Sequence, residues 1–350
     1  METILRVFYP QQLTFRRENK YTVSQCLENW KGVVRSNEYN TKLEFNNRGL
    51  RGELVPYQRQ MPSLRVFFSG DSFVEAAQVE LNNHFSRLTK EILTQKNNKK
   101  TETVTCGVGG WDNVQQLIYL KNEAYKYSPD YFLLFVYPGN DINGNYGRYY
   151  KENLKQYINR RDLNLLYRST RKENLFLRLK EYLLSHSHIF TLFKISLEKT
   201  KTKSSFEKIQ RALKMINIPE KSSKNVTMDT QTTIEKSWEL FEFLMKDFSL
   251  FCEEQNINFA VAVIPHINQI YFDRYPEQYK KIARNRWGKP DGYSKTIGIL
   301  KQNNINVIDL YPGLLKNKEH NVYFHGDMHW TPEGHRVVAG IIAEYLLSDI

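Results

Sequence analysis

The stretch that decides the fold is Val66-Phe67-Phe68-Ser69-Gly70-Asp71-Ser72. An apolar run of strand length ends in Gly-Asp-Ser, and the residues after it have the apolar spacing of a helix. We therefore predict a strand over 64–69, a tight turn at Ser72 and a helix over 75–95. A serine at such a turn exposes its hydroxyl at the edge of a sheet and offers its N–H to an oxyanion. A serine at this position also fits a plain helix N-cap. A catalytic role for Ser72 therefore requires partner residues elsewhere in the chain.

The rest of the chain alternates apolar runs of strand length with longer segments of helical spacing. The predicted strands lie at 103–106, 131–137, 259–264 and 307–310, and the predicted helices at 112–126, 231–254, 291–302 and 332–347. The run over 131–137 is apolar throughout, which is typical of a parallel strand buried on both faces. This alternation predicts an α/β fold: a three-layer, doubly wound (flavodoxin-like) parallel sheet of about five strands, with a helical insertion.

Charge divides the chain into parts. The 350 residues carry a formal net charge of +12. Residues 151–225 hold 18 Lys and Arg against 7 Asp and Glu, so this one segment has a net charge of +11. We predict an irregular N-terminal extension over 1–60 that packs on the core, an α/β core over 61–150 and 226–350, and a basic helical insertion over 151–225 that forms a cap or lid.

The composition is that of a globular protein, with 41% hydrophobic and 13% aromatic residues. It contains no run of 18 apolar residues that would suggest a transmembrane helix. Glu2 and Arg6 interrupt the start of the chain, which therefore does not resemble a signal peptide. Cys26, Cys106 and Cys252 are widely spaced and odd in number, which favours buried thiols in a reducing compartment. We therefore predict a cytoplasmic protein without a transmembrane segment.

Four short motifs fall where predicted strands end or where the last helix begins. They are Gly70-Asp71-Ser72, Gly110, Gly139-Asn140-Asp141 and Asp327-Met328-His329. Catalytic groups gather at the carboxyl edge of a doubly wound sheet, where parallel strands end together. In this order and at these places, the motifs resemble the four signature blocks of the SGNH (GDSL) hydrolases. The resemblance covers the core from about 47 to 347, apart from the basic segment.

The resemblance implies a role for each motif. Ser72 would be the nucleophile, and His329 the base that activates it and returns the proton to the leaving group. Asp327 would orient the imidazole and stabilise its charged form. The Ser72 N–H, the Gly110 N–H and the Asn140 side-chain amide would form the oxyanion hole.

Several of these residues also have a purely structural interpretation. Taken alone, Gly110 fits a loop glycine, and Asn140 fits an Asx turn. Asp71 and Asp141 are assigned to turn and scaffold hydrogen bonds rather than to catalysis.

Histidines around the last motif raise the question of a metal site. His325 and His335 lie near His329, but no further cluster of Cys, Asp or Glu completes a ligand set. We therefore predict neither a metal nor a cofactor. His266 follows the fourth predicted strand and fits a plain loop histidine better than a pocket residue.

The last motif departs from the usual family pattern in its spacing. Most members place the acid three residues before the histidine, whereas Asp327 lies two before His329. Asp-Met-His-Trp-Thr resembles the Asp-x-His-Trp pattern of the alginate O-acetyltransferases, which use the same triad to move acetyl groups onto a polysaccharide. The spacing therefore admits acyl transfer as well as hydrolysis.

The leading prediction is a serine esterase that hydrolyses an O-acylated carbohydrate or a lipid-like ester through an acyl-serine intermediate. One alternative is an O-acyltransferase that moves an acetyl group onto a glycan with the same triad. The other is a non-catalytic glycan-binding module.

The expected partner is a small-molecule, glycan or lipid ester. Amphipathic spacing within 151–225 fits either a lid that contacts an anionic surface or a packed cap with solvated lysines. The segment lacks the usual aromatic-basic motifs of nucleic-acid binding, so we do not expect that partner.

Overall fold

The computed structural model describes residues 1–8, 11–19, 22–59, 61–97, 100–151, 155, 175–196, 230–272 and 292–350. The chain forms two compact units. One comprises Met1–Phe15 and Arg171–Thr232, and the other Arg16–Thr170 and Thr233–Ile350. The second unit, called the core unit below, holds every residue predicted for the site. Most of the predicted basic insertion lies outside the described residues.

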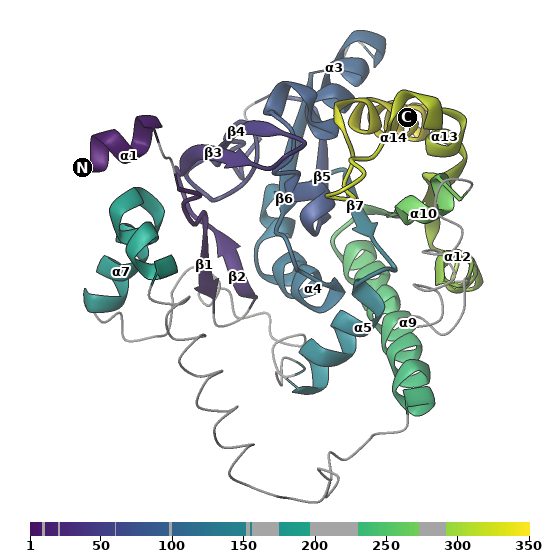
Figure 1. The fold of residues 1–350 in the computed structure, drawn as a ribbon. Coiled ribbons are helices and arrows are strands. Elements are labelled where there is room, and N and C mark those ends of the chain that lie inside the picture. Colours follow the sequence, from purple (N-terminus) through teal and green to yellow (C-terminus); the bar gives the residue numbers. More distant parts are fainter. Residues whose placement is uncertain are drawn as a thin grey trace, which may run out of the picture. The chain divides into compact units, whose positions relative to one another are not determined.

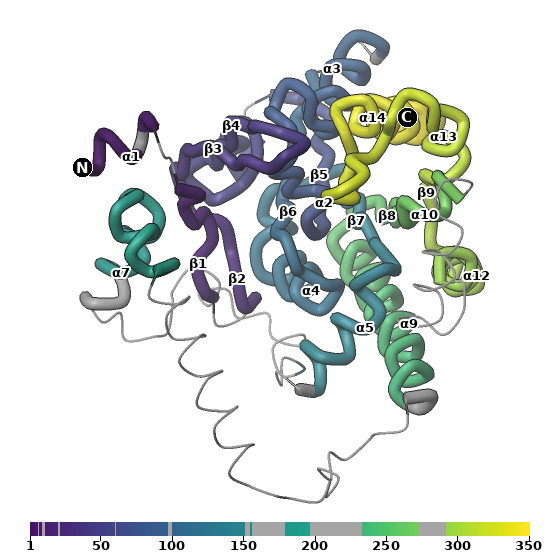
Figure 2. Tube along the Cα trace, viewed as in Figure 1, coloured from purple at the N-terminus to yellow at the C-terminus, as the bar shows by residue number. Residues whose placement is uncertain are grey.

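A parallel sheet of five strands forms the centre of the core unit (Figure 1). In spatial order its strands are β6 (Thr101–Gly107), β5 (Leu64–Gly70), β7 (Tyr131–Val136), β8 (Asn258–Val263) and β9 (Asn306–Asp309). This is the doubly wound order in which the first strand lies inside the sheet and the strand order reverses beside it. In Figure 2, β8 lies beside β7, and β9 lies beyond β8. The predicted α/β fold and its parallel sheet are confirmed, and each strand lies within two residues of its predicted range.

Helices follow every strand of the sheet along the chain, and the last two come after β9. They are α2 (Ser72–Glu75), α3 (Phe85–Asn97), α4 (Asn113–Asn122), α5 (Asp141–Tyr146), α9 (Thr230–Glu254), α10 (Ile267–Ile270), α12 (Gly292–Gln302), α13 (Tyr311–Lys316) and α14 (Pro332–Asp349). Short 3-10 turns cover Leu81–Asn83, Ala124–Tyr127 and Lys318–His320, and a π-helical turn, η3, covers Gly147–Lys151.

Alternate side chains of β5 point to opposite faces of the sheet, each covered by a layer of helices. Phe68 packs edge-on against Phe85 of α3, with ring centroids 5.2 Å apart. Phe67 points to the opposite face, where Tyr119 of α4 lies 6.3 Å away. Both strand residues are fully buried. A strand covered on both faces buries its side chains at every position, which is why three successive residues, Val66-Phe67-Phe68, are apolar.

The prediction of one helix over 75–95 is wrong in its first half. α2 ends after one turn because Ala76 adopts the left-handed conformation with φ of 47°. α3 then begins only at Phe85. Between the two helices, the Thr41 hydroxyl donates to the Gln78 carbonyl at 2.8 Å. A distant side chain thus takes over a backbone group that a continuous helix would have bonded, and tertiary contacts override the helical spacing.

The segment predicted to be irregular over 1–60 contains two antiparallel hairpins. Strand β1 (Arg16–Asn19) pairs with β2 (Val23–Cys26), and β3 (Lys31–Arg35) pairs with β4 (Asn40–Glu44). Exposure alternates along β4, so the hairpin turns one face to the core. These strands have four or five residues, which is too short for a clear alternating pattern in the sequence.

The smaller unit contains α1 (Glu2–Phe8) and α7 (Leu175–His186). The Glu2 carboxylate accepts hydrogen bonds from the backbone N–H groups of His188 and Ile189, at 2.9 and 3.0 Å. These N–H groups lie at the start of a helix over 188–196, where a negative charge is stabilising. In the described part of the chain, no helix combines the length and apolarity needed to span a membrane.

Candidate active site

Ser72 is the first residue of α2 and follows β5 by two positions. The Asp71 carboxylate caps the helix by accepting the Phe73 N–H at 2.9 Å. A Cβ at Gly70 would lie 2.3 Å from the Val74 side chain, so the turn closes this tightly only around a glycine. Local sequence therefore places the serine at the carboxyl edge of the sheet, as predicted.

The structure brings Ser72, His329 and Asp327 together across 257 residues of sequence. The Ser72 Oγ lies 2.7 Å from His329 Nε2. The His329 Nδ1 lies 2.6 Å from Asp327 Oδ1. With a proton on Nδ1 donated to the carboxylate, Nε2 is the nitrogen that can accept the hydroxyl proton.

The electrostatics of this pair favour a charged imidazole. Burial by itself would lower the pKa of His329, but the hydrogen bond to Asp327 and its negative charge outweigh burial and raise the pKa. Burial would likewise raise the pKa of Asp327, but the hydrogen bond and charge of His329 hold it below its ordinary value. The carboxylate is therefore ionised at neutral pH, ready to stabilise an imidazolium.

Met328 explains how an acid only two residues away reaches the histidine. Its φ is 69°, in the left-handed region that few residues with a side chain adopt. The Phe324 N–H donates to the His329 carbonyl at 2.8 Å, and the Met328 N–H donates to the Phe324 carbonyl at 2.9 Å. This tight loop turns both side chains to the same side.

The predicted oxyanion residues lie in two loops beside the serine turn. The Asn140 side-chain N–H₂ donates to Asp71 Oδ2 at 2.9 Å, which ties it to the residue before Ser72. Gly110 has a φ of 82°, and no atom lies within 4 Å of the place where its Cβ would be. Position 110 favours a glycine because of its backbone conformation, not because a side chain would clash there.

The two other aspartates of the motifs make scaffold hydrogen bonds. Asp71 caps α2 and holds Asn140, and burial raises its pKa. Asp141 accepts the Tyr137 N–H at 2.9 Å, and burial together with the charge of Asp71 raises its pKa well above the ordinary value. These hydrogen bonds fit the predicted assignment of both residues to the turn and the scaffold.

Sequence reasoning missed three residues that contact the acid's loop. The Tyr39 hydroxyl donates to Asp327 Oδ2 at 2.8 Å, and the Gln78 amide donates to Asp327 Oδ1 at 3.0 Å. The Glu38 carboxylate accepts the Asp327 N–H at 2.7 Å. No local pattern marks these residues, because the contacts join positions that are 249 to 289 residues apart.

The other three histidines considered in the sequence analysis contact residues outside the proposed triad. His335 is buried in α14 and stacks parallel to the Phe85 ring, with centroids 5.8 Å apart. The His325 ring lies 5.1 Å from Tyr271. His266 caps α10 by accepting the Asn268 N–H at 3.1 Å. Among the described residues, no group of three His, Cys, Asp or Glu is arranged to hold a metal.

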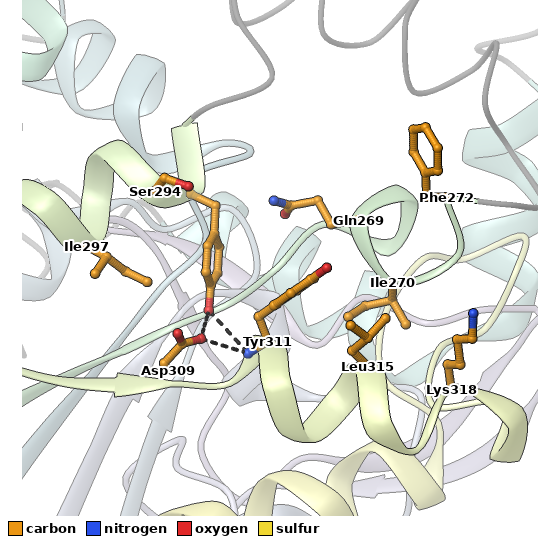
Figure 3. Close-up of a pocket in the computed structure, with 10 residues that line it drawn as sticks. Gln269, Ile270, Phe272, Ser294, Ile297, Asp309, Tyr311, Leu315 and Lys318 are labelled. Atoms are coloured by element: carbon orange, nitrogen blue, oxygen red, sulfur yellow. Dashed lines mark hydrogen bonds between the residues drawn. The ribbon is translucent and has the colours of Figure 1, made fainter.

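A cavity of about 700 Å³ lies beyond the ends of β8 and β9 (Figure 3). The Tyr293 hydroxyl donates to Asp309 Oδ1 at 2.6 Å in its wall. Its ten lining residues belong to α10, α12, α13 and their flanks, and none of Ser72, Asp327 and His329 is among them. The cavity is therefore separate from the serine site.

The C-terminal part of the chain matches a known family. Residues 221–349 match the family described as "SGNH hydrolase-like domain, acetyltransferase AlgX". The matched segment contains Asp327 and His329, and the match confirms the predicted resemblance to SGNH proteins with the AlgX-like form of the last motif. No curated protein matches the chain.

Solved structures resemble the chain at low sequence identity. The acetyl xylan esterase AlAXEase is 15% identical over 80% of this chain and 98% of its own, with a TM-score of 0.43. An acetylxylan esterase from Geobacillus stearothermophilus is 9% identical over 80% and 92%, with a TM-score of 0.42. A GDSL-like lipase from Bacteroides thetaiotaomicron is 11% identical over 82% and 89%, with a TM-score of 0.38. Because each TM-score lies below 0.5, these similarities add no argument about the substrate.

Proposed function

We propose that this chain is an SGNH-type serine enzyme that acts on acyl esters. It hydrolyses an O-acylated carbohydrate or a lipid-like ester through an acyl-Ser72 intermediate. One observation carries the proposal: His329 lies within hydrogen-bond distance of the Ser72 hydroxyl on one ring nitrogen and of the Asp327 carboxylate on the other. That is the arrangement a weak hydroxyl nucleophile needs in order to react at neutral pH.

In the first step, the Ser72 Oγ attacks the ester carbonyl carbon while its proton passes to His329 Nε2. The new carbon–oxygen bond converts the carbonyl into a tetrahedral oxyanion. Asp327 stabilises the imidazolium that forms and keeps Nε2 directed at the reacting atoms. The imidazolium then gives its proton to the leaving alkoxide as the ester bond breaks, which leaves an acyl-serine and a free alcohol.

Three donors would stabilise the oxyanion: the N–H groups of Ser72 and Gly110 and the side-chain amide of Asn140. An amide nitrogen carries two hydrogens, and the hydrogen bond to Asp71 uses one of them. The second is then available to the substrate. Loss of one such donor typically costs about 3 kcal/mol of transition-state stabilisation.

In the second step, a water molecule gives a proton to His329 and attacks the acyl carbon. The bond from that carbon to Ser72 Oγ then breaks, Oγ takes the proton back from His329, and the carboxylic acid leaves. A second candidate function differs only in this step. A sugar hydroxyl attacks in place of the water, and the product that leaves is an acetylated glycan. The match of residues 221–349 to the acetyltransferase AlgX family favours this alternative.

Labelling with a fluorophosphonate probe tests the nucleophile. We expect the full chain to be labelled at Ser72 and the Ser72→Ala variant to be unlabelled. Ser69→Ala is the matched control, since Ser69 is a buried serine three residues earlier on β5. An unlabelled but folded wild-type protein would refute the enzyme and favour the glycan-binding module.

Product analysis separates the two candidate reactions. p-Nitrophenyl acetate would be supplied with and without acetyl-acceptor oligosaccharides, and released acetate and acetylated sugar would be measured by mass spectrometry. Acetate release without sugar acetylation supports the esterase. Acetylated sugar at the expense of acetate supports the transferase.

A further inference from the structure

The acid of the proposed triad lies in a partly exposed loop. The Asp327 side chain is 21% exposed, so water can compete for its oxygens. The left-handed Met328 that brings the acid to the histidine is a conformation that costs about 1 kcal/mol or more for a residue with a side chain. An outside contact is needed to keep the carboxylate in place while the imidazole changes its charge.

The turn between β3 and β4 supplies such contacts. The Tyr39 hydroxyl donates to Asp327 Oδ2, while His329 and the Gln78 amide share Oδ1. Donors on both oxygens fix the rotation of the carboxylate about its bond to Cβ. Oδ1 therefore continues to face the histidine.

The same turn also holds the backbone of the loop. The Glu38 carboxylate accepts the Gly326 N–H at 3.0 Å and the Asp327 N–H at 2.7 Å. These two groups lie directly before Met328. A charged acceptor for two neighbouring N–H groups stabilises the loop conformation that the short acid–histidine spacing requires.

The turn is built to present these two side chains. Ser36 Oγ accepts the Glu38 N–H at 3.0 Å, and the Ser36 N–H donates to the Tyr39 carbonyl at 2.9 Å. The Tyr39 ring packs against Phe324 with centroids 5.4 Å apart. Burial and the hydrogen bond to Asp327 raise the pKa of Tyr39 to about 12, so the phenol keeps its proton at neutral pH.

We propose that Tyr39 and Glu38 are positioning residues of the acid–base pair, and that the β3–β4 turn is therefore a functional part of the active site. The inference rests on the proposed role of Asp327 and deepens it. Neither residue touches the reacting atoms. Tyr39 acts by orienting the carboxylate, and Glu38 by fixing the loop that carries it.

Tyr39→Phe tests the inference, because it keeps the ring contact with Phe324 and removes only the donor. Tyr131→Phe is the matched control, since the Tyr131 hydroxyl donates to the Asp349 carboxylate at 2.9 Å from the opposite end of a core strand. We expect Tyr39→Phe to lower kcat for p-nitrophenyl acetate and the fluorophosphonate labelling rate by roughly tenfold, with KM within about twofold of wild type. Tyr131→Phe should leave all three values within about twofold of wild type.

Glu38→Ala is the second variant, with Glu44→Ala on the same hairpin as its control. Glu44 is exposed and pairs with Lys31. We expect Glu38→Ala to slow labelling by several-fold, on the order of threefold to tenfold, and Glu44→Ala to leave it unchanged. Wild-type labelling rates in both Tyr39→Phe and Glu38→Ala would overturn the inference.

A measurement that does not depend on turnover separates this inference from the proposed function. The proton on His329 Nδ1 exchanges with water faster when its acceptor is loosely held, and faster exchange broadens its NMR signal. We expect the signal to broaden in Tyr39→Phe and to stay as in wild type in Tyr131→Phe. Equal labelling of wild type and Ser72→Ala would refute the proposed function, whereas an unchanged Nδ1–H signal in Tyr39→Phe would refute the positioning role.

Discussion

The two N-terminal hairpins contact different parts of the serine site, and with different chemistry. From β1, Arg16 binds the buried carboxylate of Glu75, which lies on α2 with Ser72. The same carboxylate accepts the Gly109 N–H at 3.2 Å, directly before the predicted oxyanion residue Gly110. From the β3–β4 turn, the contacts go instead to the partly exposed loop of Asp327.

This difference predicts a division of labour. Glu75 is 1% exposed, and a buried charge that loses its partner destabilises the whole fold. The β1 contact should therefore affect stability and the oxyanion loop together. The loop of Asp327 is exposed to water, so its contacts should affect catalysis with little change in the free energy of unfolding.

The largest effect is expected from Asp327→Asn on the acid side. Because an amide does not hold the required imidazole tautomer, kcat should fall by about 10³- to 10⁴-fold. In wild type the base must be neutral, so kcat/KM should rise with pH and reach half its maximum above the ordinary imidazole value of about 6.5. Loss of the carboxylate charge should lower the pKa of His329, measured by NMR titration. An unchanged pKa would contradict the ion pair.

Gly107→Ala should have the next largest effect, on the oxyanion side. Its Cβ would lie 1.9 Å from the Glu75 nitrogen and 2.2 Å from the Val74 carbonyl carbon, which are backbone atoms of α2. We expect a loss of about 3 kcal/mol in the free energy of unfolding and a slower labelling of Ser72. Urea denaturation and fluorophosphonate labelling would measure both.

Gly110→Ala is the control for this substitution. Its Cβ would meet no atom within 4 Å, and only its φ of 82° opposes a side chain. The expected loss in the free energy of unfolding is about 1 to 2 kcal/mol. If Gly107→Ala were the milder of the two, the close packing of β6 on the serine helix would not be what places Ser72.

Local chemistry accounts for the parts of the fold and site that the sequence predicts. The apolar run of β5 ends at Gly70, and Asp71 and Ser72 follow as a helix cap and first residue, so pattern and structure agree. The Asn140 loop likewise follows directly from the end of β7. Each of these positions is set by neighbours in the chain.

Long-range contacts account for what the sequence does not predict. The one-turn length of α2 depends on Ala76 in a left-handed conformation, which no residue preference marks. Tyr39 is part of a four-residue hairpin turn, and its hydrogen bond to Asp327 spans 288 residues. The short acid–histidine spacing was visible, but the conformation of Met328 that makes it work was not, since residues with a side chain rarely adopt it.

Arg16→Met should have an intermediate effect, mainly on stability. The variant keeps an apolar stem but leaves the Glu75 carboxylate buried beside Cys26 without its cation. We expect a loss of about 2 kcal/mol in the free energy of unfolding, below the cost of breaking a fully buried pair because Arg16 is 36% exposed. Urea denaturation measures it. A loss of activity in Arg16→Met without a loss of stability would contradict the proposed division of labour.

Lys31→Ala should have the smallest effect, and it tests whether the β3–β4 hairpin acts through its turn or through its strands. Lys31 pairs with Glu44 across the hairpin at 3.0 Å, and their side chains are 69% and 60% exposed. Solvent weakens such a pair, so the free energy of unfolding should change by less than about 1 kcal/mol. The labelling rate of Ser72 should stay at the wild-type value, because the turn contacts to Asp327 are left intact. A slower rate would mean that the strands of the hairpin, and not Glu38 and Tyr39 alone, hold the acid in place.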